Sequence, residues 1–227
     1  MRAMILAAGR GERMGHLTRS IPKPLIPIAG KALIVYQIER LRDAGFSELV
    51  INLAYRSSQI RAHLGTGREF GVVIEYSEEP AGALDTGGGI AAALKLLSPD
   101  PFIVVNCDIW TDFDFSKLSA PTGQAHLVLV PNPGHNPDGD FCLADGKISP
   151  GPGAKLTFAG IGVYRHALFS NVRRTRFPLA PVLLEAAVRH AVSAELFQGD
   201  WIDVGTEDRL NNAKDTAAMR HLDGKSV

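Results

Sequence analysis

The 227-residue sequence predicts an α/β fold, with a doubly wound, mostly parallel but mixed sheet and a small antiparallel hairpin insertion. Strand-like apolar runs alternate with helix-like amphipathic stretches along most of the chain, which is typical of successive βαβ units. Late in the sequence, the pair Asp145-Gly146 separates two alternating segments and favours a two-residue hairpin. No linker, internal repeat or low-complexity segment interrupts the pattern, so we expect one domain over residues 1–227.

The first half of the chain begins with a strand at residues 3–8. The stretch "ALIVYQIERLRDAGF" then predicts a helix, because its apolar residues recur with helical spacing and Gly45 provides a stop signal. The same alternation continues through the strand "ELVINLAY", the helix "SSQIRAHLG", the strand "VVIEYSEE", the helix "TGGGIAAALKLL", the continuous strand "PFIVVNCDIW" and the strand "AHLVLV".

The second half contains the hairpin "DFCLADGKIS" and a further strand, "LTFAGIGVY". A helix, "LAPVLLEAAVRHA", follows Pro178. The last segment, "WIDVGTEDRLNNAKDTAAM", predicts a short strand and then a helix. Thr206 is the expected N-cap of this helix, and Glu207 and Asp208 favour its first turn.

Composition excludes several classes of protein. Lys plus Arg and Asp plus Glu both number 24, so the basic excess of a nucleic-acid-binding protein is missing. The two cysteines, Cys107 and Cys142, have no metal-type spacing and fit a reducing cytoplasm. The N-terminus lacks the features of a signal peptide, and no run of 18 apolar residues predicts a membrane span. We therefore expect a cytoplasmic protein with no nucleic-acid or membrane partner.

A glycine-rich basic loop, "MILAAGRGERM", follows the first strand and leaves two interpretations open. Its backbone N–H groups and Arg13 suit a phosphate, although a tight turn with solvated arginines fits as well. A dinucleotide-binding turn is excluded, because the prolines of "HLTRSIPKPLIPIAG" rule out the helix that it requires. A P-loop is excluded, since no lysine–serine or lysine–threonine pair follows. Lys23, between two prolines, is either a phosphate ligand or a surface lysine.

Two aspartates stand at predicted strand ends. Asp108 ends the apolar run "FIVVNC", and Asp203 follows "WI". The carboxyl ends of strands in an open α/β sheet are where ligands bind, and carboxylates are suitable ligands for Mg²⁺. The alternative is that each aspartate begins a turn. Asp112 and Asp114 are expected to be turn or helix-start residues.

The segments "LAAGRGERM" and "PKPLIPIAGKALI" together resemble the signature of the sugar-1-phosphate nucleotidyltransferases. The resemblance extends over nearly the whole chain, through "LDTGGGIAAAL", "VNCDIW" and "WIDVGT". It implies a Rossmann-like nucleotidyltransferase fold and an enzyme that makes an NDP-sugar and pyrophosphate from a nucleoside triphosphate and a sugar 1-phosphate. It also implies Mg²⁺ as cofactor. We expect a monomer or a small homo-oligomer.

The resemblance also implies roles for individual residues. The expected catalytic residues are Arg13, Lys23 and Asp108, and the expected metal ligands are Asp108 and Asp203. The expected nucleotide-binding residues are Leu6, Ala7, Ala8, Gly9, Gly11, Asp85, Thr86 and Gly87. The expected sugar-binding residues are Asn106, Gly139 and Gly160. Turn chemistry is an equally good explanation of Gly139.

In its short length and in the segment "DTGGGI", the chain is most similar to family members that use UTP and N-acetylmuramic acid 1-phosphate in peptidoglycan recycling. The resemblance implies these two substrates. The carboxylate of that sugar needs a cation, for which Arg165 and His166 are candidates. The alternatives are a GTP-dependent or other hexose or heptose 1-phosphate enzyme, and a non-catalytic nucleotide-sugar binding protein. A glycosyltransferase is disfavoured, because "NCDIWTD" lacks the usual Asp-x-Asp pair.

Two departures from the family pattern bear on the site. Cys107 stands immediately before the first metal aspartate, where most relatives have glycine. A side chain there is expected to affect how closely a ligand approaches Asp108. The glutamate–lysine pair that many relatives use against the sugar has no counterpart between Lys147 and Lys155. The chain also lacks the hexapeptide repeats of an acetyltransferase extension, so only nucleotidyl transfer is expected.

Overall fold

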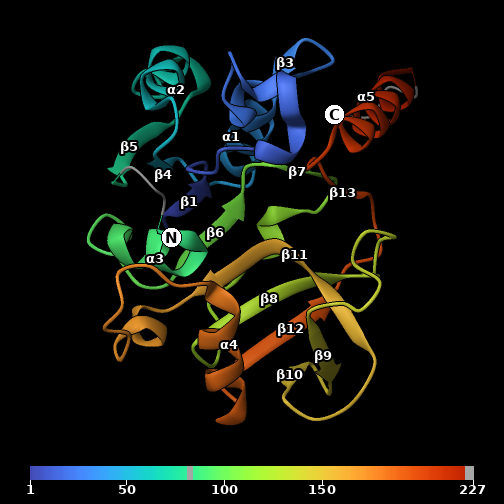
Figure 1. The fold of residues 1–227 in the computed structure, drawn as a ribbon. Coiled ribbons are helices and arrows are strands. Elements are labelled where there is room, and N and C mark those ends of the chain that lie inside the picture. Colours follow the sequence, from blue (N-terminus) through green and yellow to red (C-terminus); the bar gives the residue numbers. More distant parts are fainter. Residues whose placement is uncertain (81–83, 223–227) are drawn as a thin grey trace.

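A computed structural model describes residues 1–80 and 84–222 and has the predicted α/β architecture (Figure 1). Its main sheet has nine strands in the order β5-β4-β1-β6-β11-β8-β12-β10-β9. Two further pairs of short strands, β13-β7 and β2-β3, lie beside it. The strands are β1 (Ala3–Leu6), β2 (Pro27–Ile28), β3 (Lys31–Ala32), β4 (Glu48–Leu53), β5 (Val73–Glu78), β6 (Phe102–Asn106), β7 (Ile109–Thr111), β8 (Ala125–Val130), β9 (Phe141–Ala144), β10 (Lys147–Ser149), β11 (Lys155–Tyr164), β12 (Val192–Leu196) and β13 (Trp201–Asp203).

The first four strands of the sheet, β5, β4, β1 and β6, run parallel to one another. Leu6, the last residue of β1, lies opposite both Asn52 of β4 and Asn106 of β6. These strands therefore deliver their carboxyl ends to one edge. The sheet becomes antiparallel at β11, which pairs with both β6 and β8. The antiparallel part thus extends beyond the predicted hairpin, while β12 returns parallel to β8.

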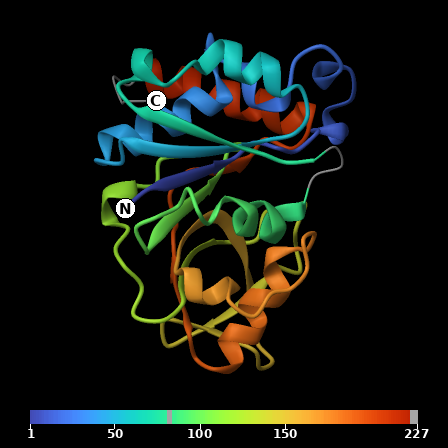
Figure 2. The ribbon, with the colours of Figure 1, turned by 90° about the vertical axis from the view of Figure 1, so that its left-hand side faces the viewer.

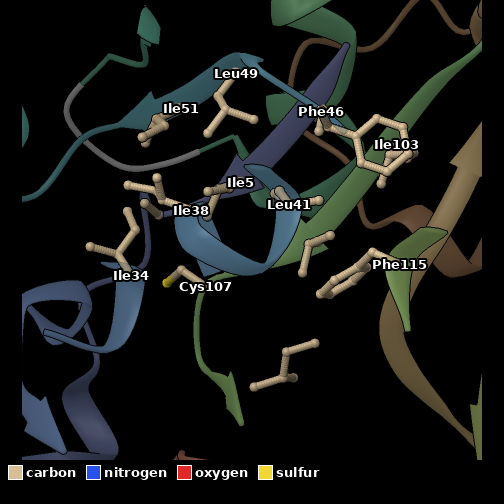
Figure 3. Packing of buried hydrophobic residues seen from close by; sticks show 14 of the residues in the cluster. Ile5, Ile34, Ile38, Leu41, Phe46, Leu49, Ile51, Ile103, Cys107 and Phe115 are labelled. Carbon is tan, nitrogen blue, oxygen red and sulfur yellow. The ribbon is translucent and has the colours of Figure 1, made fainter. Parts of the chain in front are cut away.

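Helices cover both faces of the sheet, as a doubly wound fold requires. The α-helices are α1 (Leu33–Asp43), α2 (Ser57–Leu64), α3 (Asp85–Ala93), α4 (Leu179–Val188) and α5 (Glu207–Leu222). Figure 2 shows α1, α2 and α5 on one side of the first strands, with α3 and α4 on the other. Alternation along β1 explains this arrangement, because Ile5 packs into the cluster under α1 (Figure 3), whereas Met4 packs into the cluster with α3 and α4.

The hairpin prediction is confirmed. Strands β9 and β10 pair antiparallel, with Ala144 opposite Lys147. The two turn residues, Asp145 and Gly146, have φ angles of 49° and 71°, which a type I′ turn requires. Thr206 also caps α5 as predicted, since its Oγ1 accepts a 3.4 Å hydrogen bond from the backbone N–H of Arg209.

Three sequence expectations need correction. The run "PFIVVNCDIW" forms two strands, because the chain turns at Cys107 and Asp108 and β7 leaves the main sheet to pair with β13. A 3₁₀ helix (Glu12–Thr18) follows the glycine loop, where no helix was expected. It is kinked at Gly15, whose φ of 56° and ψ of −118° are not helical, and is therefore not the regular α-helix of a dinucleotide site. Finally, the sequence pattern missed strand β12.

Among the helices of the described residues, none is both long enough and apolar enough to cross a membrane.

Candidate active site

Two adjoining cavities open beside the carboxyl ends of β1 and β6. The larger, of about 670 Å³, lies between the glycine loop and the start of α3. The smaller, of about 290 Å³, lies between β11, β13 and the loop that precedes β9. Both cavities are lined by Arg13, Asn106 and Asp108, so these three residues mark the junction. This arrangement suits two ligands that meet at a shared charged centre.

The glycine loop forms one wall of the larger cavity. Leu6, Ala8, Gly9 and Gly11 all line it. A Cβ atom at Gly11 would lie 3.0 Å from the Cβ of Lys23, and the φ of Gly11 is +67°. Gly11 therefore allows the loop to fold closely onto Lys23. Ala7 is buried, and its N–H donates a 2.7 Å hydrogen bond to Oδ1 of Asn52.

Lys23 is buried rather than solvated, so the surface-lysine alternative is wrong. Only 7% of the residue is exposed, and its Nζ lies 2.5 Å from Oδ2 of Asp108. The ion pair joins the short 3₁₀ helix Lys23–Leu25 to the end of β6. A buried ammonium needs a partner of this kind, because desolvation otherwise disfavours its charge. Arg13 is exposed at the junction of the cavities.

The two strand-end aspartates lie on neighbouring segments. Asp203 of β13 is opposite Ile109 of β7 in the antiparallel ladder, and the N–H of Val204 donates to the carbonyl oxygen of Asp108. Both aspartates line the smaller cavity. The divergence of β7 from the main sheet therefore brings together two carboxylates that are 95 positions apart in the sequence.

One carboxylate oxygen of Asp203 contacts an arginine and a histidine. Its Oδ2 lies 2.8 Å from Nη1 of Arg209 and 3.5 Å from Nε2 of His135. Burial, followed by the charge of Arg209, lowers the pKa of His135 below its usual value. The other carboxylate oxygen, Oδ1, is buried and accepts no hydrogen bond from any described residue. That oxygen is a suitable donor for a hard cation.

At the far end of the larger cavity lie Asp85 and Thr86, in the first turn of α3. Asp85 has a φ of 59°, and its carboxylate pairs with Arg176 at 3.2 Å. Gly87 is buried against Phe177, whose ring would lie 2.4 Å from a Cβ atom at this position. Gly87 therefore permits close packing, while Asp85 and Thr86 border the cavity.

Five polar residues in the described lining of the larger cavity were not expected from the sequence, and two of them, Asn52 and Glu79, are buried; the others are Arg10, Glu12 and Arg176. Nδ2 of Asn52 donates a 2.6 Å hydrogen bond to Oε1 of Glu79, and Oε2 of Glu79 accepts from the N–H of Leu84. This network ties β1, β4 and the entry to α3 together. A signal for Asn52 was available, because it interrupts the buried apolar run of β4.

The expected sugar-binding residues fall into two groups. Asn106 and Gly160 line the smaller cavity. Gly139 is instead packed against Oδ1 of Asn132 and the backbone of Lys155, outside the described lining of both cavities. The carboxylate candidates Arg165 and His166 are also elsewhere, because Arg165 pairs with Asp100 and His166 contacts the carbonyl oxygen of Leu97.

Cys107, expected from the sequence to affect the approach to Asp108, is only 4% exposed. The residue lines the larger cavity and belongs to the apolar cluster beneath α1 (Figure 3). Burial raises the pKa of its thiol well above the usual value. The thiol thus behaves as a small apolar group.

Gly160 is expected to be sensitive to a methyl group. It lies in a register shift of β11, has a φ of +74°, and its Cβ would be 2.6 Å from Nδ2 of Asn106. Gly160→Ala should lower the free energy of unfolding by about 2–3 kcal/mol, through backbone strain and the clash. Gly146→Ala is the matched control, since its φ is +71° with nothing within 4 Å, and it should cost only about 1 kcal/mol. Urea unfolding measures both losses of free energy. Equal losses for the two variants would show that Gly160→Ala does not displace Asn106.

The fold and this site belong to a known class of protein. The nucleotidyl transferase family model matches residues 2–130, and the chain belongs to this family. It is 49% identical to N-acetylmuramate alpha-1-phosphate uridylyltransferase of Neisseria meningitidis serogroup B, over 94% of this chain and 97% of that protein. It is 33% identical to the protein of the same name from Caulobacter vibrioides, over 89% of this chain and 91% of that one.

Solved structures support the same fold. A putative glucose-1-phosphate thymidylyltransferase from Bacillus anthracis, solved in complex with a sucrose, superposes with a TM-score of 0.85 at 20% identity, covering 96% of this chain and 95% of that one. HddC from Yersinia pseudotuberculosis, complexed with GMP-PN, superposes with a TM-score of 0.79 at 21% identity, covering 95% and 99% of the two chains.

Proposed function

We propose that the chain catalyses uridylyl transfer from UTP to N-acetylmuramic acid 1-phosphate, with release of pyrophosphate. The observation that carries the proposal is the pair of cavities that meet at Arg13, Asn106 and Asp108. A nucleoside triphosphate fits the larger cavity, with its base toward α3 and its phosphates along the glycine loop. The sugar fits the smaller cavity. The relatives from Neisseria and Caulobacter, which carry the uridylyltransferase name, support this choice of substrates.

The reaction needs alignment more than a strong base. An oxygen of the sugar phosphate attacks the α-phosphorus of UTP. The bond between the α-phosphorus and the α,β-bridging oxygen breaks, and pyrophosphate leaves with the electron pair of that bond. The attacking phosphate has a second pKa near about 6, so it is already largely ionised at neutral pH. Both reactants are polyanions, so their negative charge must be neutralised before they can approach each other. Lys23, Arg13 and the amides of the glycine loop are positioned to do so.

Asp108 and Asp203 fit a bound Mg²⁺. Asp203 offers a buried oxygen that no described residue binds, and Oδ1 of Asp108 remains beside the oxygen that pairs with Lys23. No cluster of three or more potential metal-binding side chains occurs among the described residues. Two carboxylates nevertheless suit Mg²⁺, which keeps several waters and takes phosphate oxygens as further ligands. When bound, Mg²⁺ supplies charge neutralisation for the reacting phosphates.

The smaller cavity offers a cation, Arg13, for the lactyl carboxylate of the sugar. Arg13 and His135 line it, and Arg209 stands behind Asp203. A carboxylate gains most from such partners where water is excluded. Arg13 therefore replaces Arg165 and His166 as the candidate partner of the carboxylate, with His135 as a neighbouring donor. A cytoplasmic enzyme that returns the sugar to peptidoglycan synthesis would need this recognition.

A matrix of substrates tests the proposal. UTP, ATP, GTP, CTP and dTTP would each be combined with the 1-phosphates of N-acetylmuramic acid, N-acetylglucosamine, glucose, mannose and heptose, and pyrophosphate release would be measured. We expect the highest kcat/KM with UTP and N-acetylmuramic acid 1-phosphate. A maximum on a sugar without the carboxylate would overturn the substrate assignment and favour another hexose or heptose 1-phosphate. Binding without turnover in every combination would favour a non-catalytic nucleotide-sugar binding protein.

A further inference from the structure

The outer wall of the smaller cavity carries a chain of polar side chains that has no role in the mechanism above. Asn136, Asp140 and Thr157 line the cavity, and Asn132 supports them. Asn132, Asn136 and Asp140 belong to the loop between β8 and β9, whereas Thr157 is a buried residue of β11. These four residues are called the amide relay below. The relay lies in the part of the chain where the glutamate–lysine pair of many relatives has no counterpart.

Backbone carbonyl groups fix the orientation of the first amide in the relay. Nδ2 of Asn132 donates hydrogen bonds to the carbonyl oxygens of Pro137 and Lys155, at 3.0 and 2.9 Å. Because carbonyl oxygens only accept, the NH₂ group of Asn132 must face them. Oδ1 of Asn132 consequently accepts the hydroxyl proton of Thr157, at 3.0 Å.

The orientation passes along the relay to the cavity. The hydroxyl of Thr157 has one proton, which it donates in the hydrogen bond to Asn132. The hydroxyl oxygen of Thr157 therefore acts as an acceptor toward Nδ2 of Asn136, at 3.1 Å. The same Nδ2 lies 3.3 Å from Oδ1 of Asp140, a second acceptor. Both amide protons of Asn136 are thus used. Its Oδ1 makes no hydrogen bond within residues 1–80 and 84–222, and it is the atom left to a ligand.

Asp140 and Gly139 keep the relay in place. Oδ2 of Asp140 accepts a 2.8 Å hydrogen bond from the N–H of Phe158, which anchors the loop to β11. Gly139 has a φ of +62°, and a Cβ there would lie 2.8 Å from Oδ1 of Asn132. A side chain at this position would therefore displace the first amide. Gly139, expected from the sequence to contact the sugar, acts on the sugar cavity through Asn132.

We propose that Asn136 is a specificity-determining residue, whose Oδ1 accepts a hydrogen bond from an N–H or O–H group of the acceptor sugar. Asn132, Thr157 and Asp140 are positioning residues that hold this oxygen toward the cavity. The inference rests on the proposed function, because it takes a sugar 1-phosphate as the ligand of the smaller cavity. Asn136 and Asp140 present acceptor oxygens, so the donor groups of the sugar face them. The lactyl carboxylate is then left to Arg13, which lines the junction with the larger cavity.

The test compares Asn136→Ala with the wild type by steady-state kinetics. We expect the KM for the sugar 1-phosphate to rise about tenfold, because one hydrogen bond to the sugar is lost. The KM for the nucleoside triphosphate should change less than about twofold. N-Acetylmuramic acid offers three donors in the smaller cavity, the amide N–H at C2 and the hydroxyls at C4 and C6. The comparison is repeated with three analogues of the sugar 1-phosphate, each of which lacks one of these donors. With one of the analogues, the wild type and Asn136→Ala should have the same KM, and that analogue identifies the donor that binds Asn136. An unchanged KM, or a penalty that persists with all three analogues, would overturn the proposal.

Thr157 provides a matched pair of variants for the positioning role. Thr157→Val removes the hydroxyl and should raise the same KM, whereas Thr157→Ser keeps the relay and should stay close to the wild type. Equal effects of the two variants on this KM would contradict the relay. If Thr157→Val fails to fold, Asn136→Ala on its loop still decides the matter. All variants would be assayed with the acceptor that the wild type uses best, so a different sugar would overturn the proposed substrate without deciding the role of Asn136.

Discussion

Replacing Lys23 with methionine is expected to lower kcat/KM at least 100-fold, equivalent to about 3 kcal/mol of transition-state stabilisation. Methionine keeps most of the buried stem that packs against Gly11, while it removes the ammonium group at the junction of the two cavities. That group is positioned to neutralise the reacting phosphates, and charge neutralisation in a partly buried site is worth more than in water. Pyrophosphate release under kcat/KM conditions measures the loss.

Lys31 offers a matched control for the Lys23 variant. It forms an ion pair of the same 2.5 Å length with Glu39, outside both cavities. Lys31→Met should therefore leave kcat/KM within about twofold of the wild type, as expected for a partly exposed pair. Arg13→Ala removes a second charge near the reacting phosphates. It should lower kcat/KM about tenfold or more, the effect of losing one charged contact. Near-normal turnover of both the Lys23 and Arg13 variants would remove the proposed phosphate site.

Asp108→Asn is expected to reduce kcat by 100-fold or more, about 3 kcal/mol, because it removes both a metal ligand and the partner of Lys23. A chelator should abolish the activity of the wild type, and added Mg²⁺ should restore it. Asp203→Asn should be less damaging, since Arg209 and His135 still hold that side chain in place. The measurement is turnover against Mg²⁺ concentration for each variant.

Asp114 supplies the control for the aspartate variants. It caps the 3₁₀ helix Phe115–Lys117 through a 3.0 Å hydrogen bond to the N–H of Ser116, away from the described lining of both cavities. Asp114→Asn should leave the Mg²⁺ dependence unchanged. Full activity of chelator-treated wild-type enzyme would contradict the metal model.

The sequence was sufficient to predict most strands and helices, because hydrophobic periodicity and turn chemistry are local. It also singled out Asp108 and Asp203, since each stands at the end of a predicted strand and ligands bind at strand ends. Their proximity was implied only by the family resemblance. It depends on β7 leaving the main sheet to pair with β13, and no local pattern encodes that pairing.

Burial of charged groups was the other property that the sequence could not provide. The flanking prolines of Lys23 indicated a rigid position, but its burial depends on Asp108, which lies 85 residues away. Asn52 belongs to β4 and Glu79 directly follows β5, so the two acquire a role only when their side chains meet beside Gly89 of α3. Arg165 and His166 failed as carboxylate ligands for the same reason, because a place after a strand does not say which cavity a side chain faces.

The most direct test of the account is the reaction of the wild-type protein with UTP, N-acetylmuramic acid 1-phosphate and Mg²⁺. Pyrophosphate and the UDP-sugar would be quantified together by ³¹P NMR. We expect both products to form in equal amounts, neither to form when the sugar phosphate is left out, and added pyrophosphate to regenerate UTP. Consumption of UTP without a UDP-sugar, or binding of both substrates with no pyrophosphate released, would contradict it.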